Sequence, residues 1–154
     1  MKTVFMIDGG AGRAIAAIPA LIKYSKKSND FRIMVNGWDN LFWGIPELHD
    51  KVFNPDQKGA LDQFFMDADK VVSPEPYRVP GYYKQEKSLA EAFDYLINET
   101  DDHSDLGLPV IKTNKNEELQ AANFIRETKQ QQQKQKTIVI QPFGRSMEKP
   151  QEKV

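Results

Sequence analysis

Short apolar runs alternate with helical patterns along the first hundred residues. Compact apolar segments at residues 3–8, 31–35, 51–53 and 70–72 are typical of buried strands. An apolar helix pattern at 14–21 follows the first strand, and a second helix is predicted from Ser88, as N-cap, to about Asn98. Because strands that alternate with helices indicate βαβ units, the sequence predicts an α/β fold with a mostly parallel sheet.

The later part of the chain changes character twice. Residues 73–81 contain three prolines and are predicted to form a loop, whereas a helix begins at Asn114 or Asn116 and runs into a glutamine-rich stretch. A strand is predicted at 137–140, and it resembles the opening of a second α/β unit. We therefore expect a Rossmann-like domain over residues 1–113, and a linker helix with the start of a truncated second domain over 114–154.

Composition excludes several classes of protein. A net charge of -1 gives no electrostatic reason to expect nucleic acid or an anionic membrane as a partner. The chain has no cysteine, which removes thiol nucleophiles, disulfides and thiolate metal sites and agrees with a reducing compartment. No apolar run is long enough for a transmembrane segment and no signal peptide is evident, so we expect a cytoplasmic protein.

A glycine-rich loop joins the first strand to the first helix. Gly9, Gly10 and Gly12 stand where the free N–H groups of a helix end favour an anion and where a ligand can approach the backbone. The loop does not fit a dinucleotide fingerprint, since the third glycine position is Ile15, and no Walker sequence occurs. A simple tight turn is the alternative interpretation of these glycines.

Other candidate chemistry is weaker. His49 and His103 are isolated, so metal binding is disfavoured and no cofactor is expected. Trp38 and Tyr82 could stack on a sugar or a base, although ordinary packing is the commoner role for such side chains.

Three segments together resemble a known family. Residues 7–21, which run Ile-Asp-Gly-Gly-Ala-Gly-Arg and continue to Ile-Pro-Ala-Leu, are similar to the N-terminal signature of heptosyltransferase-like glycosyltransferases of the GT-B fold. Residues 45–53 resemble that family's stretch after its second unit, and residues 138–144 resemble the first strand and donor-side loop of its second domain.

The resemblance implies a two-domain transferase with its site in the cleft between the domains. The N-terminal domain would receive a glycan or sugar acceptor, the second would bind a nucleotide-sugar donor, and transfer would invert the anomeric centre without a metal. The substrate-binding candidates are then Gly9, Gly10, Gly12, Trp38 and Tyr82. The donor-side loop would comprise Phe143, Gly144, Arg145 and Ser146.

The chain departs from the family at the expected catalytic base. The family usually has an aspartate directly after the last loop glycine, but this chain has Arg13, which cannot act as a base at neutral pH. Asp8 could replace the base or pair with Arg13 across the loop, and we favour pairing; Arg13 could also bind an anionic acceptor or a donor phosphate. Asp8 and Arg13 are the candidate catalytic residues.

The resemblance implies that these 154 residues hold only the start of the donor-binding domain. We therefore expect the chain to be inactive alone and to need the missing C-terminal domain or a partner half. The alternative function is a non-catalytic, Rossmann-like module that binds a glycan or a nucleotide.

Overall fold

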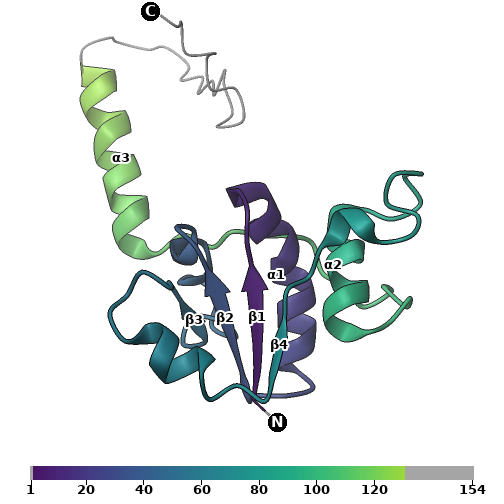
Figure 1. Cartoon of the computed structure of the whole chain (residues 1–154). Coiled ribbons are helices and arrows are strands. Elements are labelled where there is room, and N and C mark those ends of the chain that lie inside the picture. Colours follow the sequence, from purple (N-terminus) through teal and green to yellow (C-terminus); the bar gives the residue numbers. More distant parts are fainter. Residues whose placement is uncertain (1, 131–154) are drawn as a thin grey trace, which may run out of the picture. The chain divides into compact units, whose positions relative to one another are not determined.

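The first unit of the chain is built on one parallel sheet. The computed structural model describes residues 2–130, and the chain divides into two units, Met1–Thr113 and Asn114–Val154, which are considered separately. In the described part, β1 (Thr3–Ile7), β2 (Phe31–Val35), β3 (Val52–Phe53) and β4 (Lys70–Val72) form a sheet in the order β3-β2-β1-β4 (Figure 1). All pairings are parallel, which confirms the predicted α/β, Rossmann-like fold.

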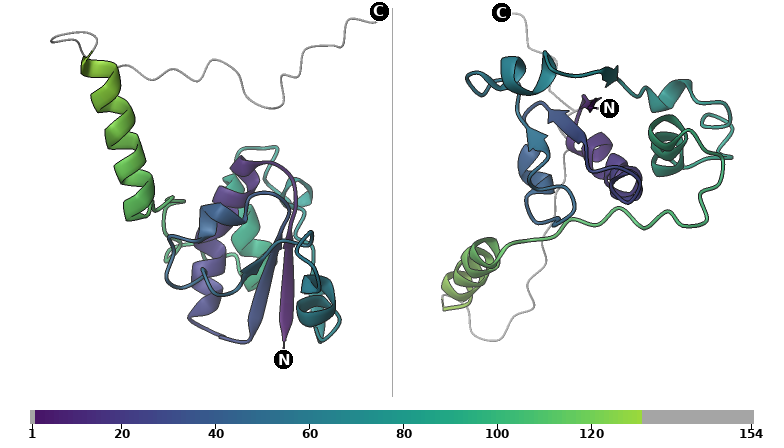
Figure 2. Two further views of the ribbon diagram at one scale, coloured as in Figure 1. Left: turned by 90° about the vertical axis from the view of Figure 1, so that its left-hand side faces the viewer. Right: turned by 90° about the horizontal axis from the view of Figure 1, so that it is seen from below.

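Helices cover one face of this sheet. Alternate residues of β1 point to opposite faces, and on one side Phe5 and Ile7 join a core shared with α1 (Ala11–Ser25) and α2 (Leu89–Asn98). The right-hand view of Figure 2 shows both helices on the same side of the strands. The glycine-rich loop is thereby fixed between a buried strand and a buried helix.

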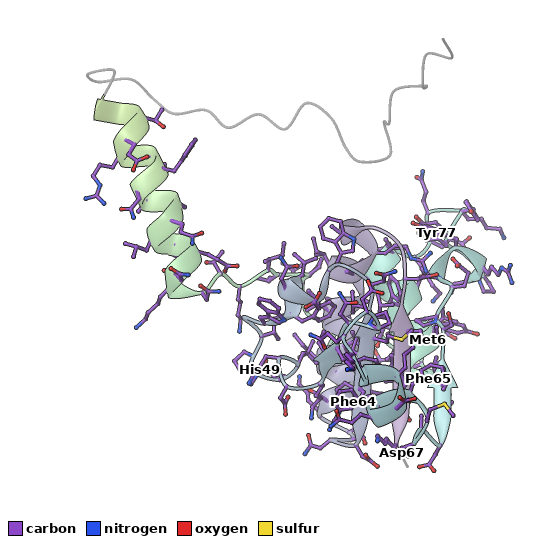
Figure 3. All side chains as sticks on the ribbon, turned by 60° about the vertical axis from the view of Figure 1, so that its left-hand side comes forward. Met6, His49, Phe64, Phe65, Asp67 and Tyr77 are labelled. Carbon is purple, nitrogen blue, oxygen red and sulfur yellow. The ribbon has the colours of Figure 1, made fainter. Side chains whose placement is uncertain are left out.

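The opposite face has a smaller cover. Val4 and Met6 of β1 pack there in a cluster with Phe64 and Phe65, which belong to the π-helical turn η2 (Leu61–Phe65) (Figure 3). The bond from Met66 N–H to the carbonyl of Leu61 gives the turn its wider spacing.

Helix α2 begins where the sequence predicts. Ser88 Oγ accepts a hydrogen bond from the backbone N–H of Glu91, and the Glu91 carboxylate accepts one from Ser88 N–H at 2.6 Å. This capping box satisfies two donors that a helix end otherwise leaves free. The helix ends at Glu99, whose φ of 54° is left-handed.

A buried ionic network joins α1 to α2. Lys23 Nζ donates to Asp94 Oδ2 at 3.1 Å and lies 2.6 Å from Asp105 Oδ1, while Asp94 also contacts His103 Nδ1 at 2.7 Å. Asn98 donates to the other Asp94 oxygen at 2.8 Å. Burial lowers the pKa of Lys23, but its hydrogen bonds to Asp105 and Asp94 outweigh burial and raise that pKa above its usual value. The two helices are therefore held in one arrangement by the ion pairs and hydrogen bonds around Lys23 and Asp94.

The remaining elements are short or lie in the second unit. Turns of 3₁₀ helix occur at η1 (Asp39–Phe42) and η3 (Pro76–Arg78), the latter inside the loop predicted for 73–81. In the second unit, α3 (Lys115–Gln130) begins at Asn114, whose Oδ1 accepts from the N–H groups of Asn116 and Glu117. The predicted strand at 137–140 and the predicted donor-side loop Phe143–Ser146 lie outside the described residues.

The strand order creates a switch point beside β1. The chain moves from β1 through β2 to β3 on one side, and then returns to place β4 on the other side of β1 (Figure 1). Loops that follow β1 and β4 therefore diverge at the carboxyl end of the sheet, which is where open α/β sheets bind ligands.

Candidate functional site at the switch point of the sheet

Arg13 connects the three segments that meet at the switch point. From the first turn of α1, its Nη2 donates to Asp8 Oδ1 at 2.7 Å and to the carbonyl of Pro74 at 3.3 Å. Its Nη1 lies 3.3 and 3.4 Å from the two carboxylate oxygens of Glu75, in the loop after β4. The pairing of Asp8 with Arg13 that the sequence favours is present in the structure.

Gly9 makes room for the arginine side chain. Its φ is +89°, a conformation that side chains rarely adopt, and a Cβ at this position would lie 2.7 Å from Arg13 Cδ. The guanidinium carbon lies 5.2 Å from the centre of the Tyr77 ring and 6.0 Å from that of Phe93. Arg13 is thus held by packing as well as by charge, and only 13% of its side chain is exposed.

The cluster carries a net negative charge. One guanidinium faces two carboxylates, of which the Asp8 side chain is 67% exposed and that of Glu75 is 40% exposed. The two Asp8 oxygens differ: Oδ1 binds Arg13, whereas Oδ2 has no hydrogen-bond partner among residues 2–130. An anionic ligand would therefore be repelled by the cluster, whereas a hydroxyl group of a ligand could donate a hydrogen bond to Asp8 Oδ2.

Space remains above the loop itself. A Cβ placed on Gly10 or Gly12 would meet nothing within 4 Å. Gly10 is the N-cap of α1 and provides no side-chain cap, and Arg13 N–H donates to the Gly10 carbonyl at 3.0 Å, so in the described part of the chain the N–H groups of Ala11 and Gly12 are left without an acceptor. A polar ligand group can therefore approach the free N–H groups at the start of α1 and the Asp8 carboxylate.

The two predicted aromatic residues lie in different surroundings. Tyr82 is connected to the cluster, because its ring centre is 5.3 Å from that of Tyr77, which in turn stacks on Arg13. Trp38 follows β2, is half-buried and packs against the core on the α1 side of the sheet. Roles for both side chains in binding stay predictions.

Sequence reasoning missed Glu75 and Tyr77. Both follow β4, and their proximity to Arg13 depends on β4 lying next to β1 rather than at the far edge. Figure 3 shows Tyr77 toward the end of the sheet opposite to Asp67, which precedes β4. The available signal in the sequence is an acidic residue three positions after a predicted strand, which has many structural explanations.

Fold and site together define a Rossmann-like α/β domain with an arginine and two carboxylates at its switch point. No protein-family model, curated protein or solved structure matches this chain. Within residues 2–130, no group of three or more histidine, aspartate or glutamate side chains is arranged to hold a metal ion. The helices of the described part include none with the length and apolar character needed to cross a membrane.

Proposed function

We propose that this chain is the acceptor-side domain of a heptosyltransferase-like, GT-B glycosyltransferase. The protein would transfer a sugar from a nucleotide-sugar donor to a glycan acceptor with inversion. The observation that carries this proposal is the Asp8 carboxylate, which Arg13 holds at the switch point through one oxygen while the other oxygen stays open. Sugar transfer needs such a carboxylate, because the acceptor hydroxyl must lose its proton as it attacks.

In the proposed reaction, the acceptor hydroxyl donates to Asp8 Oδ2 before transfer. The acceptor oxygen forms a bond to the anomeric carbon, the bond from that carbon to the diphosphate oxygen breaks, and the proton passes to Asp8. The diphosphate leaves from the opposite face, so the configuration inverts. Arg13 is a positioning residue in this scheme: it fixes Asp8, and Glu75 fixes Arg13.

This arrangement accounts for the departure from the family pattern. Arg13 occupies the position of the expected base, and a carboxylate five residues earlier in the chain is available in its place. The net negative charge of the cluster also favours the acceptor over the donor, because a nucleoside diphosphate would be repelled by Asp8 and Glu75. Donor binding is therefore assigned to the second domain.

A non-catalytic binding module is the second candidate function. It is favoured by the contacts of Arg13, whose guanidinium is engaged by two carboxylates and a carbonyl of the protein itself. A module of this kind would bind a glycan and transfer nothing.

Calorimetry on the 154-residue chain tests whether it binds the acceptor rather than the nucleotide-sugar donor. The probes are neutral oligosaccharides, sugar phosphates, and UDP- and GDP-sugars. We expect neutral oligosaccharides to bind, and nucleotide sugars to bind at least tenfold more weakly, which corresponds to ~1.4 kcal/mol. Tight binding of a nucleotide sugar that Asp8→Asn strengthens would contradict an acceptor-side site. The matched control is Asp50→Asn, which removes a carboxylate near Lys51 that is about as exposed as that of Asp8. This variant should change neither the affinity for oligosaccharides nor that for nucleotide sugars.

A further inference from the structure

Three tyrosine rings lead from the Arg13 cluster to the protein surface. Tyr77 lies 5.2 Å from the guanidinium carbon of Arg13, Tyr82 packs edge-on against Tyr77 at 5.3 Å, and Tyr83 packs edge-on against Tyr82 at 5.3 Å. In this tyrosine series Tyr77 is 36% exposed, Tyr82 is half-buried, and the outermost ring, Tyr83, is 80% exposed. An aromatic ring so exposed gains little for folding, so its burial is available for binding.

A groove of about 650 Å³ begins at the outer end of the tyrosine series. This volume falls within the ~300–1,000 Å³ that is typical of small-molecule sites. Aromatic, amide and acidic side chains share the lining with one lysine and one serine: Tyr82, Tyr83, Gln85, Glu86, Lys87, Ser88 and Glu91.

The polar groups of the groove suit hydroxyl groups better than anions. In the described part of the chain, no hydrogen bond or ion pair engages the side chains of Gln85 and Glu86, and both are exposed. The lining lysine, Lys87, already binds Asp101 Oδ1 at 2.9 Å, and this hydrogen bond raises the pKa of Lys87 above its usual value. The groove therefore offers an amide and a carboxylate to a ligand, but its cation is already paired.

The loop that carries these side chains has a defined shape. Its backbone is closed by bonds from Gln85 N–H to the carbonyl of Tyr82 and from Glu86 N–H to the carbonyl of Gly81, both at 3.0 Å. Gly81 has a φ of +88°, and Gln85 has a φ of 59°, which is unusual for a residue with a side chain. A left-handed φ is unfavourable for a residue with a side chain, and residues in such conformations cluster at ligand-binding sites.

We propose that this groove is a subsite for a neutral oligosaccharide, with Tyr83 as the stacking platform. The C–H groups on one face of a pyranose ring pack on the electron-rich face of an aromatic ring, while its hydroxyl groups bond to side chains such as Gln85 and Glu86. The tyrosine series then connects this subsite to Asp8, so the acceptor is a glycan chain of two or more sugars. The identification of the ligand as an acceptor rests on the proposed function; sugar binding in the groove does not.

The test compares glucose, maltotriose, cellotriose and chitotriose as ligands of the full chain, by calorimetry and by ¹H–¹⁵N spectra. At least one trisaccharide should bind about tenfold more tightly than glucose, as expected when ~1.4 kcal/mol of added contact is gained in a second subsite. Tyr83→Ala should remove this advantage. Tyr83→Trp should retain the advantage, because it keeps a stacking surface.

Trp43→Ala is the matched control, since Trp43 is also a largely exposed aromatic residue, at 58%, and does not line the groove. Equal loss of the trisaccharide advantage in Trp43→Ala and Tyr83→Ala would overturn the subsite, as would absence of binding by all three trisaccharides. If a trisaccharide shifts the amide signals of residues 9–13 and binds Tyr83→Ala as tightly as the wild type, the subsite is overturned but the proposed function is not. Binding that depends on Tyr83 but leaves residues 8–13 unshifted would support the subsite and contradict the proposed function.

Discussion

Alanine at Gly9 and at Gly12 should change stability in opposite directions. At Gly9 the new methyl group would lie 2.7 Å from Arg13 Cδ, on a backbone whose φ is +89°. The backbone alone costs about 1–3 kcal/mol, and movement of Arg13 away from its partners adds to this cost. At Gly12, in the first turn of α1, the methyl group would meet nothing within 4 Å, so the better helix propensity of alanine should stabilise the fold by about 0.5–1 kcal/mol.

Urea unfolding measures both effects, with tryptophan fluorescence and circular dichroism as independent probes. We expect Gly9→Ala to lose at least ~2 kcal/mol of unfolding free energy and Gly12→Ala to gain up to ~1 kcal/mol. Wild-type stability in Gly9→Ala would refute the packing of Arg13 over the loop.

The Gly12→Ala variant also distinguishes a glycine loop that binds a ligand from one that serves only as a tight turn. Gly12→Ala fills the open space above the helix end without harming the fold, so oligosaccharide binding should weaken while stability rises. If Gly12→Ala binds oligosaccharides as well as the wild type does, the glycines serve the turn and no ligand approaches them.

Three further predictions concern the elements around the site. Asp94→Ala should lower the free energy of unfolding in urea by ~3 kcal/mol, the lower end of the range for breaking a buried ion pair, because Lys23 keeps Asp105 as a second partner. The control Asp50→Asn, at a more exposed pair, should lower it by under ~0.5 kcal/mol. Ser88→Ala should cost about 0.5–2 kcal/mol and fray the start of α2, as measured by amide hydrogen exchange. Hydrogen bonds from Ser88 hold the pKa of Glu91 below its usual 4.5, so this group stabilises the fold above that pH and the contribution is lost as pH falls through the lowered value. Unfolding free energy from pH 7 to pH 3 should therefore fall less steeply in Glu91→Gln, and an unchanged slope would contradict the capping box.

Local features of the fold could be predicted because their causes lie close together in the sequence. The strand Phe31–Val35 follows from an apolar run before Asn36-Gly37, and the start of α2 follows from Ser88 three residues before Glu91. The pairing of Asp8 with Arg13 belongs to the same category, since five residues separate them.

The rest of the site depends on the order of the strands. Glu75 reaches Arg13 across 62 positions of sequence, and only the placement of β4 beside β1 brings them together. An apolar run shows that a segment is a strand, but it does not show which strand lies beside it. For the same reason Tyr82 could be named as an aromatic candidate, whereas its link to Arg13 through Tyr77 could not.

Glycosyl transfer by Asp8→Asn tests the central claim most directly. The assay uses a version of the protein that carries the donor-binding domain and follows transfer from nucleotide sugars to oligosaccharides by mass spectrometry. Asparagine keeps the size of Asp8 and one oxygen for Arg13, but its amide nitrogen cannot accept the proton of the acceptor hydroxyl, so kcat should fall by about 10²–10⁴, the usual contribution of a general base. Transfer at the wild-type rate by Asp8→Asn would contradict the assignment of Asp8 as the base and, with it, the proposed acceptor site.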